Sequence, residues 1–164
     1  MIATIHNCYR NLTRLLAKTK PGGDHLILPA DPVALKTSNS GIFCLPQQAL
    51  ALSDEQACQL VSSINDQLLH SMNGVELSVG SCPKQWWLQV PVNTKVKTVA
   101  LAKVEGREIS RFMPSGPDGA SYRALMTEIQ MLLHNHQVNQ KRRAANELTV
   151  DSIWLGRKAK WWWL

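Results

Sequence analysis

The chain has 164 residues, of which 45% are hydrophobic and 18% charged, and its formal net charge is +6 at pH 7. This length suits one domain of about 100–200 residues, and this composition can bury a core, which excludes an intrinsically disordered chain. No apolar run approaches the ~18 residues of a membrane span and no signal-peptide core opens the chain, so we expect a cytoplasmic protein without a transmembrane segment.

The positive charge is concentrated at the two ends of the chain. Near the start, four basic residues precede the first acidic one, Asp24; they are Arg10, Arg14, Lys18 and Lys20. Near the end, Glu147 and Asp151 are outnumbered by Lys141, Arg142, Arg143, Arg157, Lys158 and Lys160. Such ends are either solvated termini or surfaces that attract nucleic acid, anionic lipid or an acidic protein, and both interpretations stay open.

The first predicted element is an amphipathic helix over residues 2–18. Its apolar residues recur at three- and four-residue steps, namely Ile2, Ile5, Tyr9, Leu12 and Leu16. Pro21 and the two glycines after it end this helix. We therefore divide the chain into an N-terminal helix and linker (1–24), an α+β domain (25–156) and a basic, tryptophan-rich tail (157–164).

The first half of the predicted domain contains short strands around one well-marked helix. His25–Leu28 is expected to be extended, Asp31 and Pro32 to form a turn, and Gly41–Leu45 to form a strand. Ser53 and Gln56 predict a capping box at the start of a helix. That helix has one apolar stripe and ends at Asn73 and Gly74; the stripe is Ala57, Leu60, Val61, Ile64 and Leu68.

The second half predicts a hairpin, a further strand, a long helix and a closing strand. Val75–Val79 and Trp86–Val90 alternate apolar and polar residues, which indicates two paired strands. Thr98–Val104 is predicted to be a strand that ends in a tight turn at Glu105 and Gly106. A helix with a broad apolar stripe covers Tyr122–His136, and Leu148–Trp154 closes the domain as a strand.

This order of elements predicts the fold class. A strand, helix, strand, strand, helix, strand sequence matches the split βαβ or ferredoxin-like plan. We expect a two-layer α+β sandwich in which two main helices cover one face of an antiparallel sheet. The four cysteines, Cys8, Cys44, Cys58 and Cys82, are widely spaced without a CxxC pair, so we expect reduced thiols and neither a metal site nor a cofactor.

Residues 127–155 carry the most distinctive part of the sequence, which reads TEIQMLLHNHQVNQKRRAANELTVDSIWL. This segment resembles a pattern beginning NEIQMLLHxHPVNxxR in the archaeal-type, cofactor-independent phosphoglycerate mutase family, and most closely in its bacterial Rpf-type regulatory branch. Three upstream tracts also resemble the family, in the same order along the chain. They are PADPVAL (29–35), PKQWWLQV (83–90) and VEGREISRFMPSGPD (104–118).

The resemblance implies that this chain corresponds to a smaller domain that is inserted into the larger domain of the mutases. In those proteins the larger domain holds the metals and the phosphorylated nucleophile, and 164 residues cannot contain both domains. We therefore expect a non-catalytic interaction or ligand-binding domain that works with a protein partner or as a homo-oligomer. An alternative is an accessory lobe that completes a mutase-like metalloenzyme.

The candidate binding residues come from the same segment. Gln130 and His134 are four residues apart and share a helix face, whereas Glu128 lies on another side. Asn139 and Arg142 match the NxxR part of the pattern, Arg143 adds positive charge beside them, and Trp154 lies near the end of the segment. Arg142 either satisfies carbonyls at a helix end or offers its guanidinium fork to a phosphorylated or anionic ligand. For His136 we expect a hydrogen-bonded structural imidazole.

Three positions depart from the family pattern. Asn146 stands where a glycine is usual, a change that asparagine tolerates because it also adopts the left-handed conformation. Gln137 replaces a proline, and Asp151 replaces an asparagine. After Leu155 the glycine-rich continuation of the family gives way to a basic, aromatic tail, which puts an inherited enzymatic role in doubt.

The tail supports a second class of function. Trp161, Trp162 and Trp163 follow Lys158 and Lys160. The tryptophans either pack on the domain or a second copy, or they stack on bases or anchor at a membrane interface beside the lysines. A nucleic-acid-binding module that uses this tail with Arg142 and Arg143 is therefore an alternative function, and its binding would depend strongly on salt.

Overall fold

The computed structural model describes residues 24–157. The predicted helix over residues 2–18 and the tail residues Lys158, Lys160 and Trp161–Trp163 lie outside the described residues. Within the described part, no helix is long and apolar enough to cross a membrane.

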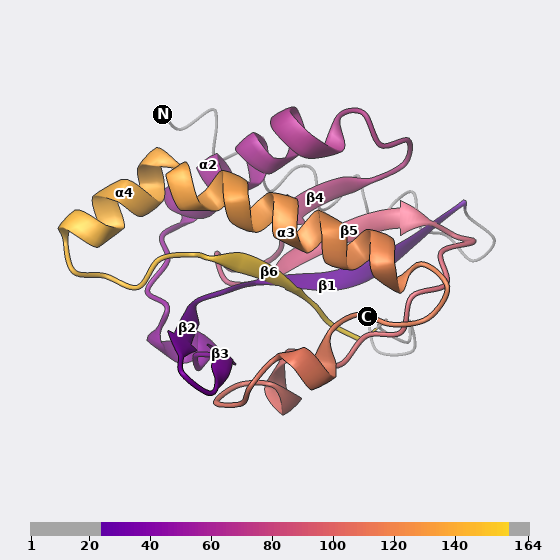
Figure 1. Ribbon diagram of the computed structural model, residues 1–164. Helices are drawn as coiled ribbons and strands as arrows, with labels where there is room; N and C mark the ends of the chain where they lie inside the picture. Colours follow the sequence, from indigo (N-terminus) through magenta and orange to yellow (C-terminus); the bar gives the residue numbers. More distant parts are fainter. Residues whose placement is uncertain (1–23, 158–164) are drawn as a thin grey trace.

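A four-stranded antiparallel sheet lies at the centre of the described fold. Its strands, in spatial order, are β4 (Glu76–Val79), β5 (Trp86–Pro91), β1 (His25–Val33) and β6 (Ser152–Leu155). The helices lie together on one face of this sheet (Figure 1); they are α2 (Asp54–Ile64), α3 (Gly119–Asn135) and α4 (Gln137–Ala144). The predicted two-layer α+β architecture is confirmed.

The helical connections each pass over one strand of the sheet. The segment containing α2 links β1 to β4, and β5 lies between those two strands. The segment containing α3 and α4 links β5 to β6, with β1 between them. The β4–β5 hairpin is confirmed, with Leu77 opposite Leu88 in its register. Apolar side chains from both layers fill the space between them, and Trp86, Leu88, Ile129 and Leu133 have no exposed surface.

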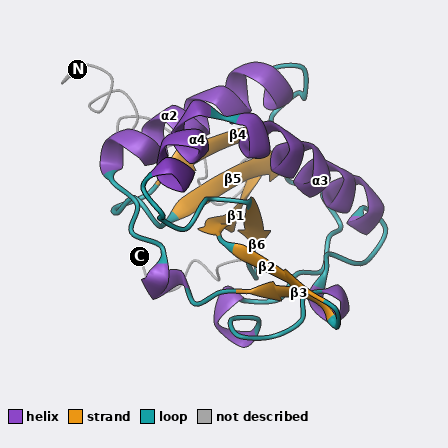
Figure 2. Ribbon diagram, turned by 60° about the vertical axis from the view of Figure 1, so that its left-hand side comes forward, coloured by secondary structure: helices purple, strands orange, loops and turns teal. Residues whose placement is uncertain are grey.

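A group of short elements lies on the other side of β1 and β6 from the helices. Here β2 (Leu35–Ser38) pairs with β3 (Gly41–Cys44) as a small hairpin on the side away from the helices, which Figure 2 shows. Only β3 was predicted. Short 3-10 turns complete this group; they are η1 (Gln47–Ala49), η3 (Leu101–Lys103) and η4 (Ser110–Phe112).

Helix α2 begins as the sequence predicts and ends in an unexpected way. Ser53 and Gln56 form both hydrogen bonds of the capping box. After Ile64 the chain continues into a single π-helical turn, η2 (Asn65–Leu69). The Asn65 amide donates to the Leu77 carbonyl at 2.8 Å and its oxygen accepts the Leu77 N–H at 2.9 Å. Asn65 therefore occupies the free edge of β4, where a further strand would otherwise pair.

The predicted turn at Asp31 and Pro32 is wrong, because β1 continues through both residues to Val33. The pairing of β1 with β5 ends at Pro29 opposite Trp87, and its pairing with β6 begins at Ala30 opposite Leu155. Proline lacks a backbone N–H. Because β1 has already left β5 at Pro32, the missing donor breaks no hydrogen bond with that strand.

Three other predictions about elements differ from the structure. Residues 98–104 form no strand: Leu101 and Val104, three residues apart, are buried on one side of the 3-10 turn η3. The closing strand starts at Ser152, four residues later than predicted. The long helix ends at Asn135, and residues 137–144 form the separate helix α4. Asn146 has a φ of 56°, as predicted for its left-handed role.

Candidate functional site

His136 forms the junction between α3 and α4. Its backbone is extended, and its Nδ1 accepts the Val138 N–H at 3.1 Å, so its side chain caps α4. Because Nδ1 must be unprotonated to accept, the neutral ring carries its proton on Nε2 and donates to Ser63 Oγ at 2.9 Å. Burial lowers the pKa of His136 and favours this neutral form. The structural role predicted for His136 is confirmed.

Asn139 lies in the interior, where it fixes α4 to the start of β6. Its Nδ2 donates to the Leu133 carbonyl at 2.8 Å and to the Val150 carbonyl at 2.7 Å. Its Oδ1 accepts the Val150 N–H at 2.9 Å. The side chain has no exposed surface, and both the amide nitrogen and the amide oxygen bond within the fold.

Arg142 is also buried, and its guanidinium joins three segments. Nε donates to the Leu148 carbonyl at 2.7 Å, and Nη1 donates to Gln56 Oε1 at 2.7 Å and lies 3.3 Å from Glu147. Arg142 is 1% exposed, and its Nη2 has no hydrogen-bond partner among the described residues. An anionic ligand could therefore approach this guanidinium only after the end of α4 moved away from α2.

The exposed candidates lie along the outer side of α3. Gln130 and His134 share an open hollow of about 410 Å³ with Thr127, Met131 and Asn135, which agrees with the predicted common face. Arg143 reaches the rim of this hollow, where its Nη2 donates to the His134 carbonyl at 2.7 Å. We call this surface the α3 ridge and define it by Thr127, Gln130, Met131, His134, Asn135 and Arg143.

Glu128 belongs to a second hollow on the other side of Met131. This hollow has a volume of about 630 Å³ and lies between α2 and α3, with Ser63, Gln67 and His136 in its lining. Met131 contributes to both hollows and is 61% exposed, so it projects between them. An exposed thioether flanked by two concave surfaces can fill an irregular gap in a partner.

Trp154 is buried, as Asn139 and Arg142 are. It is 1% exposed, and its indole Nε1 donates to the Val99 carbonyl at 2.8 Å. It lines a small cavity of about 40 Å³ together with Thr127 and Gln130. Trp154 therefore supports the α3 ridge from inside, while only the exposed residues can contact another molecule directly.

The site offers groups for recognition. The α3 ridge combines amide, imidazole and thioether side chains with the guanidinium of Arg143, and Glu128 adds a carboxylate beyond Met131. Among residues 24–157, no group of three or more histidine, cysteine, aspartate or glutamate side chains is placed to hold a metal ion. Cys44 is buried, and burial together with Glu105 raises the pKa of its thiol to about 11. It is therefore protonated at neutral pH.

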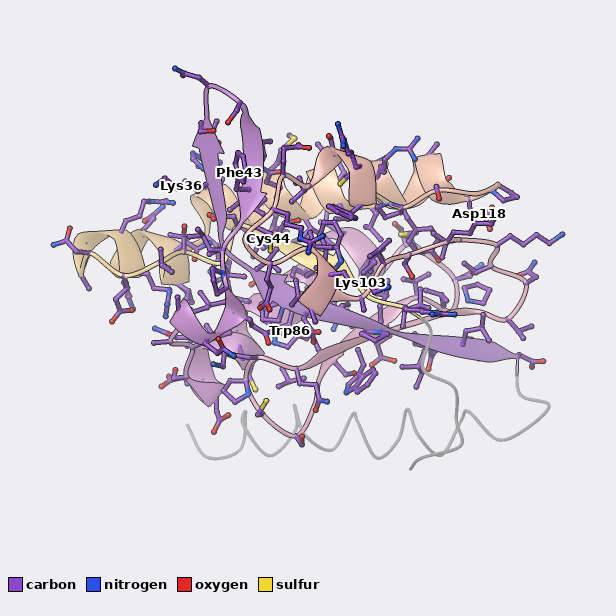
Figure 3. The ribbon with its side chains drawn as sticks, turned by 90° about the horizontal axis from the view of Figure 1, so that it is seen from below. Lys36, Phe43, Cys44, Trp86, Lys103 and Asp118 are labelled. Carbon is purple, nitrogen blue, oxygen red and sulfur yellow. The ribbon has the colours of Figure 1, made fainter. Side chains whose placement is uncertain are left out.

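Asp31 is a titratable residue for which the sequence predicted only a position in a turn. Its Oδ1 accepts the Trp86 N–H at 3.2 Å where β1 leaves β5. Burial raises the pKa of this carboxyl to about 6, and the nearby charge of Glu105 acts in the same direction. Figure 3 labels Trp86 and Cys44, seen from the side of the sheet away from the helices. Only the PADPVAL tract of the sequence drew attention to Asp31.

Comparisons with known proteins identify a fold and no more. No protein-family model matches the sequence, and a search of curated proteins finds no match. The structure is similar to that of a cofactor-independent phosphoglycerate mutase from Thermoplasma acidophilum DSM 1728, with a TM-score of 0.58 and 16% identity. The similarity covers 84% of this chain, which spans 37% of the length of that mutase. The described fold is therefore mutase-like.

Proposed function

We propose that this protein is a non-catalytic interaction domain of the mutase-like type, equivalent to the inserted domain of phosphoglycerate mutase-like proteins. The observation that carries the proposal is the fold similarity, which covers most of this chain but little more than a third of the mutase. A fold that forms one part of a larger enzyme is suited to contacting a second protein rather than to holding a complete active centre.

The α3 ridge is the surface that we assign to this contact. Met131 is 61% exposed between two hollows, and Gln130, His134 and Arg143 provide donors and acceptors around it. Protein interfaces commonly combine an exposed apolar anchor with a polar rim. By contrast, Asn139 and Arg142 make their hydrogen bonds inside the domain and hold α4 in place.

The partner that we propose is a catalytic domain of the mutase type, which holds the metals and the nucleophile that the family resemblance implies. In this arrangement the present chain is an accessory lobe. It supplies one wall of a shared cleft through the α3 ridge and the adjoining hollow that contains Glu128, and Arg143 and Glu128 contribute opposite charges to that wall.

Two measurements test the proposal. The purified chain, incubated with 2- or 3-phosphoglycerate and divalent metals, is expected to show no interconversion; turnover at enzyme-like rates would overturn the non-catalytic role. In the native host, tagged chain is expected to co-purify with a metallophosphatase-like protein identified by mass spectrometry.

A matched pair of variants tests the surface itself. Met131→Asp places a charge at the centre of the α3 ridge and is expected to reduce recovery of that partner at least about tenfold, a loss typical of an interface hot spot. Met72→Asp makes the same change at another exposed methionine, which is 40% exposed, and is expected to leave recovery unchanged. Equal recovery with both variants would show that the α3 ridge is not the contact surface.

A further inference from the structure

A further concave surface lies at the other end of α3, where three segments of the chain converge. They are the turn before β4, the segment that follows β5 and the first turns of α3. Together they enclose about 570 Å³, within the range of roughly 300–1,000 Å³ that small-molecule sites occupy. Asp118, labelled in Figure 3 at the start of α3, marks its rim. We call this space the end cavity.

The end cavity has an apolar side and a side rich in hydroxyl groups. Val75, Pro91 and Leu125 supply aliphatic surface. Polar groups come from the hydroxyls of Thr94, Ser121 and Tyr122, and two asparagine amides also belong to the lining. This combination is typical of sites in which a few polar groups orient a ligand against an apolar wall.

Tyr122 is a buried residue of this cavity whose hydroxyl makes one long hydrogen bond. It is 8% exposed, and its phenolic oxygen lies 3.5 Å from Thr94 Oγ1, which is at the outer limit of a hydrogen bond. Burial raises the pKa of Tyr122, so its hydroxyl stays protonated and available as a donor. Buried hydroxyl groups usually have a closer partner, and an oxygen atom of a ligand would provide one.

The end cavity is lined by one positive and one negative side chain, and hydrogen bonds connect two of its segments. Lys95 contributes an ammonium and Asp118 a carboxylate, so the lining does not select a strongly charged ligand. Asp118 Oδ2 accepts the Lys95 N–H at 2.6 Å, and the Asp118 N–H donates to the Lys95 carbonyl at 3.3 Å. These two bonds hold the segment after β5 against the start of α3, so the cavity is formed before any ligand binds.

We propose that the end cavity binds a neutral, hydroxyl-rich ring with one apolar face, chemistry that a free monosaccharide shares with the ribose of a nucleoside. The hydroxyls of Ser121 and Tyr122 would bond the ring hydroxyls, and the C–H face of the ring would pack on Pro91 and Leu125. This role is separate from the proposed function, since the α3 ridge shares no lining residue with the end cavity.

Titration of isotopically labelled full-length chain, followed by amide chemical shifts, tests this proposal. The probes are D-glucose, D-ribose and adenosine, with 2′,3′-dideoxyadenosine as the comparison that lacks the ring hydroxyls. We expect saturable shifts at Asn93, Ser121 and Tyr122 with a Kd in the millimolar range. Saturation by glucose identifies a free sugar site, and saturation by ribose and adenosine identifies a nucleoside site. No saturation by any probe, or equal binding of dideoxyadenosine, overturns the proposal.

Variants locate the binding. Tyr122→Phe removes one hydroxyl with little change of shape and is expected to weaken binding about three- to tenfold. Thr94→Val is expected to weaken it similarly, whereas Thr37→Val, the same change on the exposed strand β2, is expected to have no effect. Ser121→Ala, at an exposed position, serves if Tyr122→Phe fails to fold. Equal weakening by Thr94→Val and Thr37→Val would place the binding outside the end cavity.

Discussion

Asp31 shows how one residue can impose a pH dependence on the fold. Its carboxyl is half-buried where β1 passes from β5 to β6, and burial raises its pKa from 3.8 to about 6. The native state therefore binds the proton more tightly than the unfolded chain does. This contribution to stability is complete below pH 3.8 and is lost as the pH rises through about 6.

Replacing Asp31 by asparagine is expected to prevent this loss of stability at higher pH. The asparagine oxygen can still accept the Trp86 N–H, but the side chain never ionises. At pH 8 the variant should be more stable than the wild type by about 2 kcal/mol, and near pH 3 the difference should vanish. Urea unfolding of both proteins across this range measures the effect. A stability difference that is the same at both ends would show that Asp31 is not held in this way.

At the scale of elements, the start of α2 and the end of α4 depend on one shared acceptor. Gln56 Oε1 accepts the Ser53 N–H at 3.3 Å within the capping box and the Arg142 Nη1–H at 2.7 Å. The only acidic side chain bridged to this buried arginine among the described residues is Glu147, which is 48% exposed. The positive charge of Arg142 at the junction between α2 and α4 is therefore only partly balanced by a negative charge.

Gln56→Glu is expected to stabilise the protein by roughly 1 kcal/mol. The carboxylate would make a charge-assisted bond to Arg142 and would lie at the N-terminal end of α2, where negative charge is favourable. Gln59→Glu is the matched control on the same helix, because it replaces the bond from Gln59 to Glu55 with a like-charge pair and should lower stability. Guanidinium unfolding midpoints decide the comparison, and a lower midpoint for Gln56→Glu would contradict this account.

The sequence predicted those elements whose signals are local. The capping box and apolar stripe of α2 lie within one segment, so their spacing was sufficient. The path of β1 through Pro32 depends on which strand lies beside it, and that partner is more than 100 residues away. Asn139 stood out in the signature segment, but its bonds to Val150 belong to the folded chain alone. Gln130 and His134 were placed correctly because helix geometry alone puts them on one face.

At the scale of the whole molecule, one asparagine side chain bonds the free edge of β4 and another bonds the chain just before β6. Asn65 bonds the N–H and carbonyl of Leu77 on the free side of β4. Asn139 does the same for Val150 at the entry to β6. Asp151, the next residue, donates its N–H to Val33 in β1, so the polar groups of Val150 face away from that strand.

Asn65→Ala and Asn139→Ala are each expected to lower the free energy of unfolding by about 2–4 kcal/mol, since each leaves backbone groups without partners. Both variants should also self-associate more readily than the wild type in sedimentation experiments, because they uncover backbone groups at the edge of β4 or just before β6. Asn135→Ala, at an exposed position on α3, should change stability by less than about 0.5 kcal/mol. Variants at positions 65 and 139 that stay as stable and as monomeric as this control would contradict the role assigned to the two amides.

These two amides also restrict how other molecules can be recognised. A peptide that joined the sheet as a fifth strand at Leu77 would have to displace an amide that already satisfies both backbone groups there, and one that extended past the start of β6 would meet the amide of Asn139 at Val150. Recognition through backbone hydrogen bonds depends little on the partner's sequence. Recognition through projecting side chains depends on the identity of the residues that those side chains contact. The two asparagines therefore oppose the addition of a strand at Leu77 and Val150 and leave contacts through side chains as the favoured mode of association.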